Sequence, residues 1–299
     1  MLWLAEKQKG REDKMSFAAG DIVGRKSYGM DILFKIVEVN KKKQVALLKG
    51  LDMRLLADAE LSDLVYPEPQ IIQKYRQNSE AVRKECIHKV YRRRNLEREQ
   101  LRAVNNNAPE DFFSLPGKIL HLDGDKEYLN ECMKVYHSLE IDAVGIYVPE
   151  NQQPARVWQL LHQHRPDILV MTGHDAYIKN KNNDFKNLSN YRTSRYFVEG
   201  VYKARQYEPG KDDLVIFAGA CQSHYEEILA AGANFASSPQ RVLIHALDPV
   251  FIAEKVAFTS INESVNIFEV IKSSITGLDG VGGLETRGKF RLGLPKSPY

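Results

Sequence analysis

The sequence predicts an α/β fold, in which a doubly wound parallel sheet follows a small β-barrel and a helical linker. Three observations lead to this prediction. From residue 113 onward, short runs of branched apolar residues alternate with helical patterns, as in sheets covered by helices on both faces. Residues 18–66 contain short strand patterns joined by turns. A basic stretch with helical spacing separates the two regions.

The composition limits the classes of protein that the chain can represent. It has 299 residues, of which 43% are hydrophobic, enough for about two domains with packed cores. The formal net charge of +3 is too small to indicate a nucleic-acid partner, and no apolar run approaches the ~20 residues of a membrane span. The three cysteines (Cys86, Cys132 and Cys221) are typical of a reducing compartment and cannot form a disulfide framework or a Cys-rich zinc site. We therefore predict no metal and no cofactor.

The first region divides into a tail and a barrel. Residues 1–14 are mostly polar and charged, so residues 1–17 are expected to form a disordered tail, with Met15 as a candidate for the true start. Residues 18–66 are expected to form a small β-barrel of the SH3-like kind, because strand patterns alternate with turn signals there. The strands are expected at residues 21–25, 32–39, 44–48 and 54–57.

The second region, residues 67–112, is expected to be a basic helical linker. Pro67 and Pro69 end the barrel before it. Between residues 74 and 102 the chain has ten lysines and arginines against four glutamates. A charge run of this kind is usually the solvated face of a helix. The alternatives are contact with an anionic partner or exposure to a protease, and Arg92-Arg93-Arg94 offers a site for self-cleavage.

The third region, residues 113–299, is expected to form the α/β domain. Asp125 is a candidate cap for the helix that follows the first strand, since its side chain can accept hydrogen bonds from the first turn. The glycine-rich end, residues 277–293, is expected to form a tight hairpin or a loop near the site. The strands are expected at residues 118–125, 143–148, 168–172, 214–218 and 241–246, and the helices after Asp125 and at residues 155–165, 189–205, 249–255 and 263–276.

Two of these strands lead into a reactive side chain, His174 after the third and Cys221 after the fourth. Chemistry in parallel sheets collects at the carboxyl ends of the strands, so both side chains are expected at one edge. A thiol that attacks an amide needs an imidazole to raise its thiolate fraction or to protonate the leaving amine. Gly219 and Ala220 leave room for substrate, and a backbone N–H there can hold an oxyanion. This pattern predicts Cys221 as a nucleophile with His174 as its base.

Other residues compete for these roles. A lone cysteine or histidine is more often buried and structural, although both together at one edge favour the catalytic interpretation. His245, at the end of the fifth expected strand, is the second candidate for the base, and His224 is the third. A metal site formed by His174, His224 and Asp175 is disfavoured, because no metal-binding spacing is present.

Two enzyme architectures place such residues at a sheet edge. Caspase-like peptidases have histidine at the end of one strand and cysteine at the end of the next, in that order, which Gly173-His174 and Ala220-Cys221 resemble. Those enzymes have glycine after the histidine, where this chain has Asp175. Class I glutamine amidotransferases use a Gly-x-Cys-x-Gly elbow with a later histidine; this chain lacks the last glycine, although His245 suits that order. The caspase-like order is favoured.

At these residues the chain resembles the YabG family of sporulation-specific cysteine peptidases, over about residues 19–295. The resemblance implies a peptidase that processes spore coat and cortex proteins, cleaves after arginine and acts in the cytoplasm of the sporulating mother cell, in association with the spore coat. It also implies Cys221 as the nucleophile with His174 as its partner. The blocks that carry it are residues 20–28, 120–125, 165–170, 172–177, 217–224, 231–239, 245–249 and 282–288.

Cleavage after arginine requires an acidic residue in the substrate pocket, because a guanidinium pairs with a carboxylate through two hydrogen bonds. Asp175 and Asp248 are candidates by position, and either can instead cap a helix. Two alternatives to the peptidase remain. One is a non-peptidase thiol amidase of the Cys-elbow type that uses His245. The other is a catalytically inactive protein that binds the spore coat through its barrel.

Overall fold

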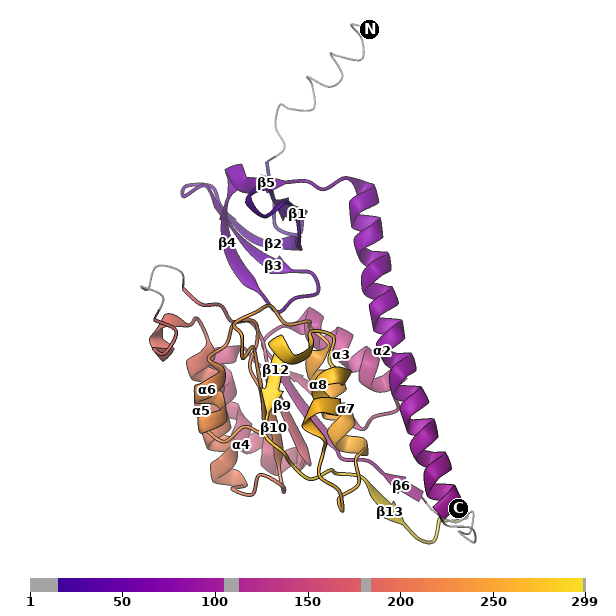
Figure 1. The fold of residues 1–299 in the computed structure, drawn as a ribbon. Helices are drawn as coiled ribbons and strands as arrows, with labels where there is room; N and C mark the ends of the chain where they lie inside the picture. Colours follow the sequence, from indigo (N-terminus) through magenta and orange to yellow (C-terminus); the bar gives the residue numbers. More distant parts are fainter. Residues whose placement is uncertain (1–15, 105–112, 179–183, 298–299) are drawn as a thin grey trace, which may run out of the picture. The chain divides into compact units, whose positions relative to one another are not determined.

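The computed structural model describes residues 16–104, 113–178 and 184–297, which divide into two compact units (Figure 1). The smaller unit contains Met1–Leu51 and Leu56–Arg76, and the larger contains Asp52–Leu55 and Gln77–Tyr299. The expected tail lies outside the described residues up to Met15, and so does the end of the expected linker, residues 105–112.

The smaller unit is a five-stranded antiparallel sheet in the order β4-β3-β2-β1-β5. The first three expected strands are confirmed, whereas the fourth begins at Leu56 rather than at Arg54. Val23, Ile36 and Leu48 are fully buried in this sheet. The SH3-like kinship of this unit stays a prediction. The elements are β1 (Ile22–Arg25), η1 (Lys26–Tyr28), β2 (Leu33–Asn40), β3 (Val45–Gly50), β4 (Leu56–Glu60), η2 (Leu61–Asp63) and β5 (Leu64–Val65).

A single long helix, α2 (Pro69–Val104), occupies most of the expected linker. Proline is well suited to a helix start, because the first N–H groups of a helix have no partner within it. The helix is not solvated all round, since Val90 and Arg94 are buried in the larger unit. Among the described residues, no helix is both long enough and apolar enough to cross a bilayer.

The larger unit is built on a six-stranded sheet in the order β12-β11-β10-β9-β7-β8. The pairs from β8 to β11 are parallel and only β12 runs antiparallel to its neighbour. A separate two-stranded sheet joins β6 and β13. The strands are β6 (Phe113–Leu115), β7 (Ile119–Asp123), β8 (Ala143–Tyr147), β9 (Ile168–Thr172), β10 (Val215–Ala218), β11 (Phe235–Ser237), β12 (Val281–Gly283) and β13 (Arg291–Gly293).

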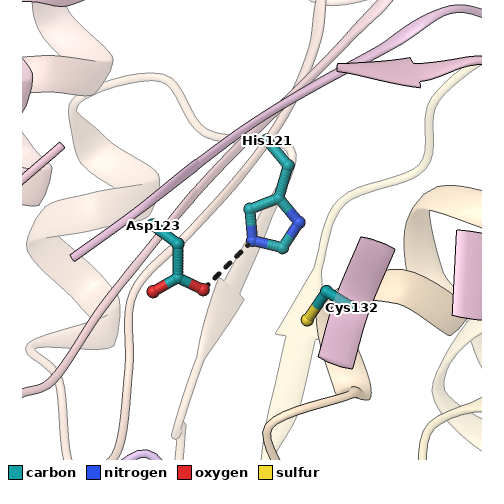
Figure 2. Close-up of side chains that lie close together, drawn as sticks. All are labelled: His121, Asp123 and Cys132. Carbon is teal, nitrogen blue, oxygen red and sulfur yellow. Dashed lines mark ion pairs between the residues drawn. The ribbon is translucent and has the colours of Figure 1, made fainter. Parts of the chain in front are cut away.

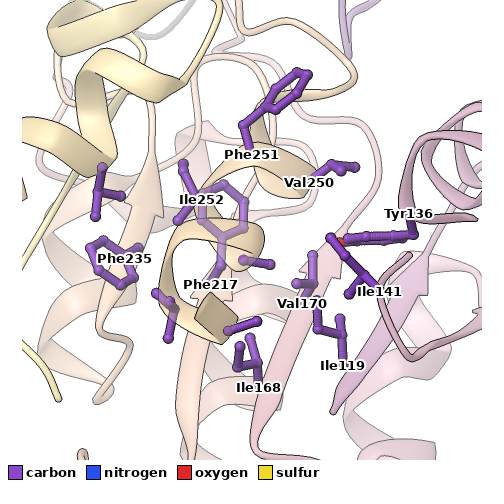
Figure 3. Packing of buried hydrophobic residues seen from close by; sticks show 14 of the residues in the cluster. Ile119, Tyr136, Ile141, Ile168, Val170, Phe217, Phe235, Val250, Phe251 and Ile252 are labelled. Carbon is purple, nitrogen blue, oxygen red and sulfur yellow. The ribbon is translucent and has the colours of Figure 1, made fainter. Parts of the chain in front are cut away.

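Helices cover both faces of this sheet, as the sequence predicts (Figure 1). Successive strand residues point to opposite faces, so Ile168 and Val170 join one buried cluster while Leu169 and Met171 join the other. Figure 3 shows the first cluster, in which Phe217 lies among residues of α7. The helices are α3 (Lys126–Ser138), η3 (Glu150–Gln152), α4 (Gln153–His164), η4 (Leu188–Asn190), α5 (Ser194–Tyr207), α6 (Tyr225–Ala230), α7 (Asp248–Phe258), α8 (Ile267–Ser273) and η5 (Gly277–Asp279).

One expected strand is wrong. Residues 241–246 form no strand, and the place beside β10 is taken by β11, which is made of the small-residue run that precedes them. Ser238 and Arg241 have positive φ angles of 64° and 56°, so the chain turns before the apolar run begins. His245 therefore lies in a loop. The glycine-rich end forms two strands that pair with β11 and β6 and not with each other.

Candidate active site

His174 and Cys221 follow neighbouring parallel strands at the same level. Met171 of β9 pairs with Ala218 of β10, and each functional residue lies three positions beyond its member of this pair. Parallel strands deliver such residues to one edge of the sheet. The shared edge that the sequence predicts is therefore present, although no hydrogen bond joins the His174 ring to the Cys221 thiol among the described residues.

The His174 ring is buried between two carboxylates. Glu150 Oε1 lies 3.2 Å from Nδ1 and accepts the backbone N–H of His174 at 2.7 Å. On the other side, Nε2 lies 3.4 Å from Asp125 Oδ2 but has no hydrogen-bond partner of good geometry in the described part of the chain. Burial lowers the pKa of His174, but the two carboxylates favour the charged ring and raise this pKa above 6.5 overall.

The two carboxylates follow the ends of β7, which lies beside β9, and of β8, which lies beyond β7. Asp125 caps α3, as predicted, because its Oδ1 accepts the backbone N–H groups of Glu127 and Tyr128. Glu150 begins η3, shortly after β8. Nothing in the sequence pattern connects either residue with His174. Gly173 makes the contact possible, since a Cβ there would lie 2.3 Å from the Glu150 carboxylate.

The Cys221 thiol is fully buried. Its sulfur accepts the backbone N–H of Ile244 at 3.2 Å and lies 3.6 Å from the Ile244 carbonyl oxygen, to which it donates. Burial raises the pKa of this thiol to about 12, and the Ile244 N–H only partly offsets that effect. In this conformation Cys221 is a protonated thiol, so an attack on substrate requires a change around it.

Gly219 and Ala220 shape the loop before Cys221. Gly219 has φ +116°, and a Cβ there would lie 3.1 Å from the Ser237 Cβ. The Ala220 N–H donates to Ser223 Oγ at 2.9 Å, and that hydroxyl donates to Asp175 Oδ2 at 2.9 Å. The Gly219 and Ala220 amides are thus both engaged within the protein, since Gly219 N–H donates to a carbonyl of β9.

The two acids proposed for arginine recognition already have several donors each. Asp175 accepts from the backbone of Ala176 and Thr193 and from two serine hydroxyls, and it is 1% exposed. Asp248 accepts the backbone N–H groups of His245, Ile275 and Thr276, and it is fully buried. These contacts hold loops together at the sheet edge.

The alternative bases also make internal contacts. His245 Nδ1 accepts the Leu247 N–H at 3.1 Å, and burial lowers the pKa of this ring. His224 caps α6, where its Nδ1 accepts the Glu227 N–H, while its Nε2 donates to the Lys186 carbonyl at 3.0 Å. Neither ring lies between carboxylates in the way that the His174 ring does.

A second buried cluster lies next to this site and was missed by the sequence analysis. His121 and Asp123 alternate along β7 and face Cys132 of α3, with their ligand atoms within 4.8 Å of one another (Figure 2). His121 Nε2 is 3.5 Å from Asp123 Oδ2 and 2.8 Å from Thr172 Oγ1. The i, i+2 spacing of two polar residues in a buried strand is the signal that could have revealed this cluster.

The cation that this cluster binds is a guanidinium, and its residues are not suited to a metal ion. Arg54 Nη1 lies 2.8 Å from Asp123 Oδ2, and Nη2 lies 3.5 Å from Cys132 Sγ. Cysteine binds a metal ion as the thiolate, whereas burial raises the pKa of Cys132 to about 12. Burial alone would raise the pKa of Asp123, but Arg54 and His121 hold it at about 2. The carboxylate is therefore charged and already paired with a cation.

Comparisons with known proteins identify relatives of the whole chain. The family model of YabG peptidase U57 matches residues 18–295. The chain is also similar to the sporulation-specific protease YabG of Bacillus subtilis (strain 168), with 45% identity over 287 residues. That match covers 94% of this chain and 99% of the relative. No solved structure matches the chain.

Proposed function

Because the chain belongs to the YabG peptidase U57 family, we propose that this sporulation peptidase is a cysteine endopeptidase that uses the thiol of Cys221. In this proposal His174 takes the thiol proton and returns it to the leaving amine. The single observation that carries the proposal is the arrangement of the two residues. They follow neighbouring parallel strands at the same level, and the imidazole lies between Asp125 and Glu150.

The two carboxylates fit this chemistry because they favour the charged imidazole. Transfer of a proton from Cys221 to His174 creates a thiolate and an imidazolium. The thiolate then forms a C–S bond with the scissile carbonyl carbon, the C–N bond breaks, and the amine leaves with the proton from His174. Water hydrolyses the thioester and restores the thiol. His174 Nε2 is the nitrogen that we assign to the transfer, because Glu150 already engages Nδ1.

The buried thiol indicates that the described conformation is a resting one. Cys221 has to lose its contacts with Ile244 and meet the imidazole before it can react. An imidazolium close to the sulfur then lowers the pKa of the thiol. The conformational change that frees Cys221 is therefore a step at which the activity can be regulated.

We extend the proposal to spore coat and cortex proteins as substrates, to cleavage after arginine, and to action in the sporulating mother cell at the spore coat. The order of the strands, with the histidine strand β9 beside the cysteine strand β10, supports the caspase-like architecture. Asp175 and Asp248 are less suited to arginine recognition than their positions in the sequence indicate, because their oxygens accept several internal hydrogen bonds. The paired Asp123 offers a different candidate.

The basic linker is poorly placed for self-cleavage. Peptidases bind extended segments, whereas Arg92-Arg93-Arg94 lies within α2. Arg93 and Arg94 also pair with the buried carboxylate of Glu254. Cleavage there would require the helix to unwind and this ion pair to break, so self-cleavage at this place is expected only after local unfolding.

The amidase and the inactive coat-binding protein remain as alternatives. The amidase would use His245, whose Nδ1 accepts a backbone N–H and whose pKa is lowered by burial. Digestion of an arginine-containing coat protein by the purified chain separates the peptidase from the other two functions. The peptidase predicts cleavage by the wild type and none by Cys221→Ala. Equal cleavage by both proteins would refute Cys221 as the nucleophile, and no cleavage by either would leave the amidase and the inactive protein.

A further inference from the structure

Residues 52–55 make isolated backbone bridges to loops that border the candidate site. Met53 pairs antiparallel with His245, and Leu55 pairs in parallel with Asp175. The Arg54 N–H donates to the Ile244 carbonyl at 3.1 Å, and the Ala246 N–H donates to the Asp52 carbonyl at 2.7 Å. These are the main-chain contacts with which peptide-binding proteins hold an extended peptide. The segment belongs to the larger unit, although its neighbours in the chain belong to the smaller one.

The segment inserts Arg54 into the buried cluster of His121, Asp123 and Cys132. The side chain of Arg54 is 0% exposed. Its Nη1 lies 2.8 Å from Asp123 Oδ2, and its Nη2 donates to the Ala246 carbonyl at 2.9 Å. The guanidinium also lies 5.4 Å from the centre of the Tyr128 ring. Carboxylate, carbonyl and aromatic ring together form a pocket for a guanidinium.

A buried ion pair of this kind is weak evidence for a structural role. An apolar side chain of similar volume often stabilises a core as well as a buried ion pair does. A buried arginine nearly always needs a charged partner, and Asp123 is that partner for Arg54. A pocket that recognises arginine in a substrate would need the same groups, at a place that the substrate backbone can reach.

The segment also contacts residues that border the proposed catalytic pair. Ile244 accepts the Arg54 N–H and is the residue that contacts the Cys221 sulfur. Tyr128 links the segment to the histidine, since its hydroxyl donates to the Met53 carbonyl at 2.6 Å and its ring lies 5.4 Å from the His174 ring. The segment is therefore held by the loops of Asp175 and His245, and the nearby Cys221 has no exposed surface.

We propose that residues 52–55 occupy the substrate cleft as a built-in substrate mimic, with Arg54 in the pocket for the substrate arginine and Asp123 as the residue that recognises it. This inference rests on the proposed cysteine peptidase and deepens it. It explains the closed state of Cys221, because a substrate can enter only after the segment leaves. It also assigns arginine recognition to an acid that the sequence analysis did not consider.

Labelling of Cys221 by an arginyl acyloxymethyl ketone tests the occupancy. Arg54→Ala empties the pocket, so its labelling rate is expected to exceed that of the wild type by at least about tenfold, because a tethered competitor acts at an effective concentration of roughly millimolar. Arg98→Ala removes an exposed arginine of α2 and is the matched control. Arg54→Gln keeps an amide donor for the Ala246 carbonyl and serves if Arg54→Ala does not fold. Unchanged labelling in a folded Arg54 variant would overturn the proposal.

A pair of peptides tests the recognition by Asp123. Citrulline has the shape of arginine without its charge, so the ratio of kcat/KM for arginyl and citrullinyl peptides reports the charge contact alone. In the Arg54→Ala protein, a further Asp123→Asn change is expected to lower this ratio roughly a hundredfold. An unchanged ratio would show that another acid reads the arginine.

The wild type supplies a measurement that needs no variant. A reversible arginyl aldehyde at saturation is expected to displace the segment and to increase amide hydrogen exchange in peptides that cover residues 51–57, whereas the citrullinyl aldehyde at the same concentration is not. If the arginyl aldehyde saturates the protein and amide exchange in residues 51–57 does not become faster, the segment does not occupy the substrate cleft. Failure of the cysteine mechanism is recognised separately, since Cys221→Ala would then keep its activity. Activity that depends on Cys221 but not on Arg54 or Asp123 would sink this inference alone.

Discussion

Glu150 holds His174 through two contacts, because one oxygen of its carboxylate faces the ring Nδ1 at 3.2 Å and accepts the backbone N–H at 2.7 Å. The carboxylate fixes the ring and favours its charged form. Glu150→Gln is therefore expected to lower the pKa of His174 and to reduce kcat at least about tenfold. Titration of the His174 ring signals by NMR checks the pKa. The same pKa in the variant and in the wild type would leave Asp125 as the main cause.

The protonation of His174 also affects stability. A pKa raised in the folded state contributes stability that is fully present below the unfolded pKa, near 6.5, and is lost as the pH rises through the folded value. When the pH rises from about 6 to 9, the free energy of unfolding should therefore fall less for the Glu150→Gln protein than for the wild type. Urea denaturation measures both values. If the free energy of unfolding changes with pH in the same way for both proteins, the contact between Glu150 and His174 is not the cause of the pH dependence.

The three cysteines allow a test of the nucleophile within one chain. Cys221→Ala is expected to lower kcat/KM on an arginyl peptide by at least about 10³-fold, because removal of a nucleophile abolishes the covalent step. Cys86, which is half-buried, and Cys132, which lies next to Arg54, have no part in that step. Cys86→Ala is the matched control and should keep its activity within about twofold. A large loss in Cys86→Ala would place the reactive thiol elsewhere.

The two histidines at the sheet edge separate the peptidase from the amidase. His174→Ala is expected to reduce kcat by roughly 10²–10⁴-fold, the usual contribution of a general base. His245→Ala removes only the acceptor of the Leu247 N–H and should change stability more than kcat. Steady-state kinetics and thermal unfolding of both variants decide the matter. If His245→Ala alone abolishes activity, the elbow-type mechanism is favoured.

Most of the fold could be predicted because local patterns determine it. Buried parallel strands appear as apolar runs, and β9 and β10 lie within one residue of their expected bounds. The short strand β11 could not be found, since Phe235-Ala236-Ser237 has too few branched residues to form a distinct run. The more apolar residues 241–246 were predicted as a strand instead. Positive φ angles at Ser238 and Arg241 turn the chain away from the sheet.

The site was only partly predictable, for a different reason. His174 and Cys221 each follow an apolar run, so their shared edge could be inferred from strand order. Glu150 and Arg54 lie in short connecting segments, and nothing in their local pattern shows which side chain they contact. The contact between Arg54 and Asp123 joins residues 69 positions apart, which no periodicity can reveal.

The buried carboxylate of Glu254 anchors α2 and should be important for stability. Glu254 is fully buried on α7, and its Oε1 accepts from Arg93 at 2.7 Å and from Arg94 at 2.8 Å. Glu254→Gln removes the carboxylate that pairs with Arg94 and leaves Arg93 its longer contact with Glu97, at 3.5 Å. This change is expected to lower the free energy of unfolding by about 3 kcal/mol. Urea denaturation measures this loss. Glu99→Gln, at an exposed position of α2, should cost less than about 0.5 kcal/mol.

Asp123 should make the larger unit sensitive to acid. Burial alone would raise its pKa, but Arg54 and His121 hold it at about 2, below its ordinary value of 3.8. A depressed pKa contributes stability above pH 3.8 that is lost as the pH falls toward 2, here about 2 kcal/mol. Between pH 5 and 3, the free energy of unfolding measured in urea should therefore fall less for Asp123→Asn than for the wild type. If both proteins lose stability equally, other carboxylates cause the acid sensitivity.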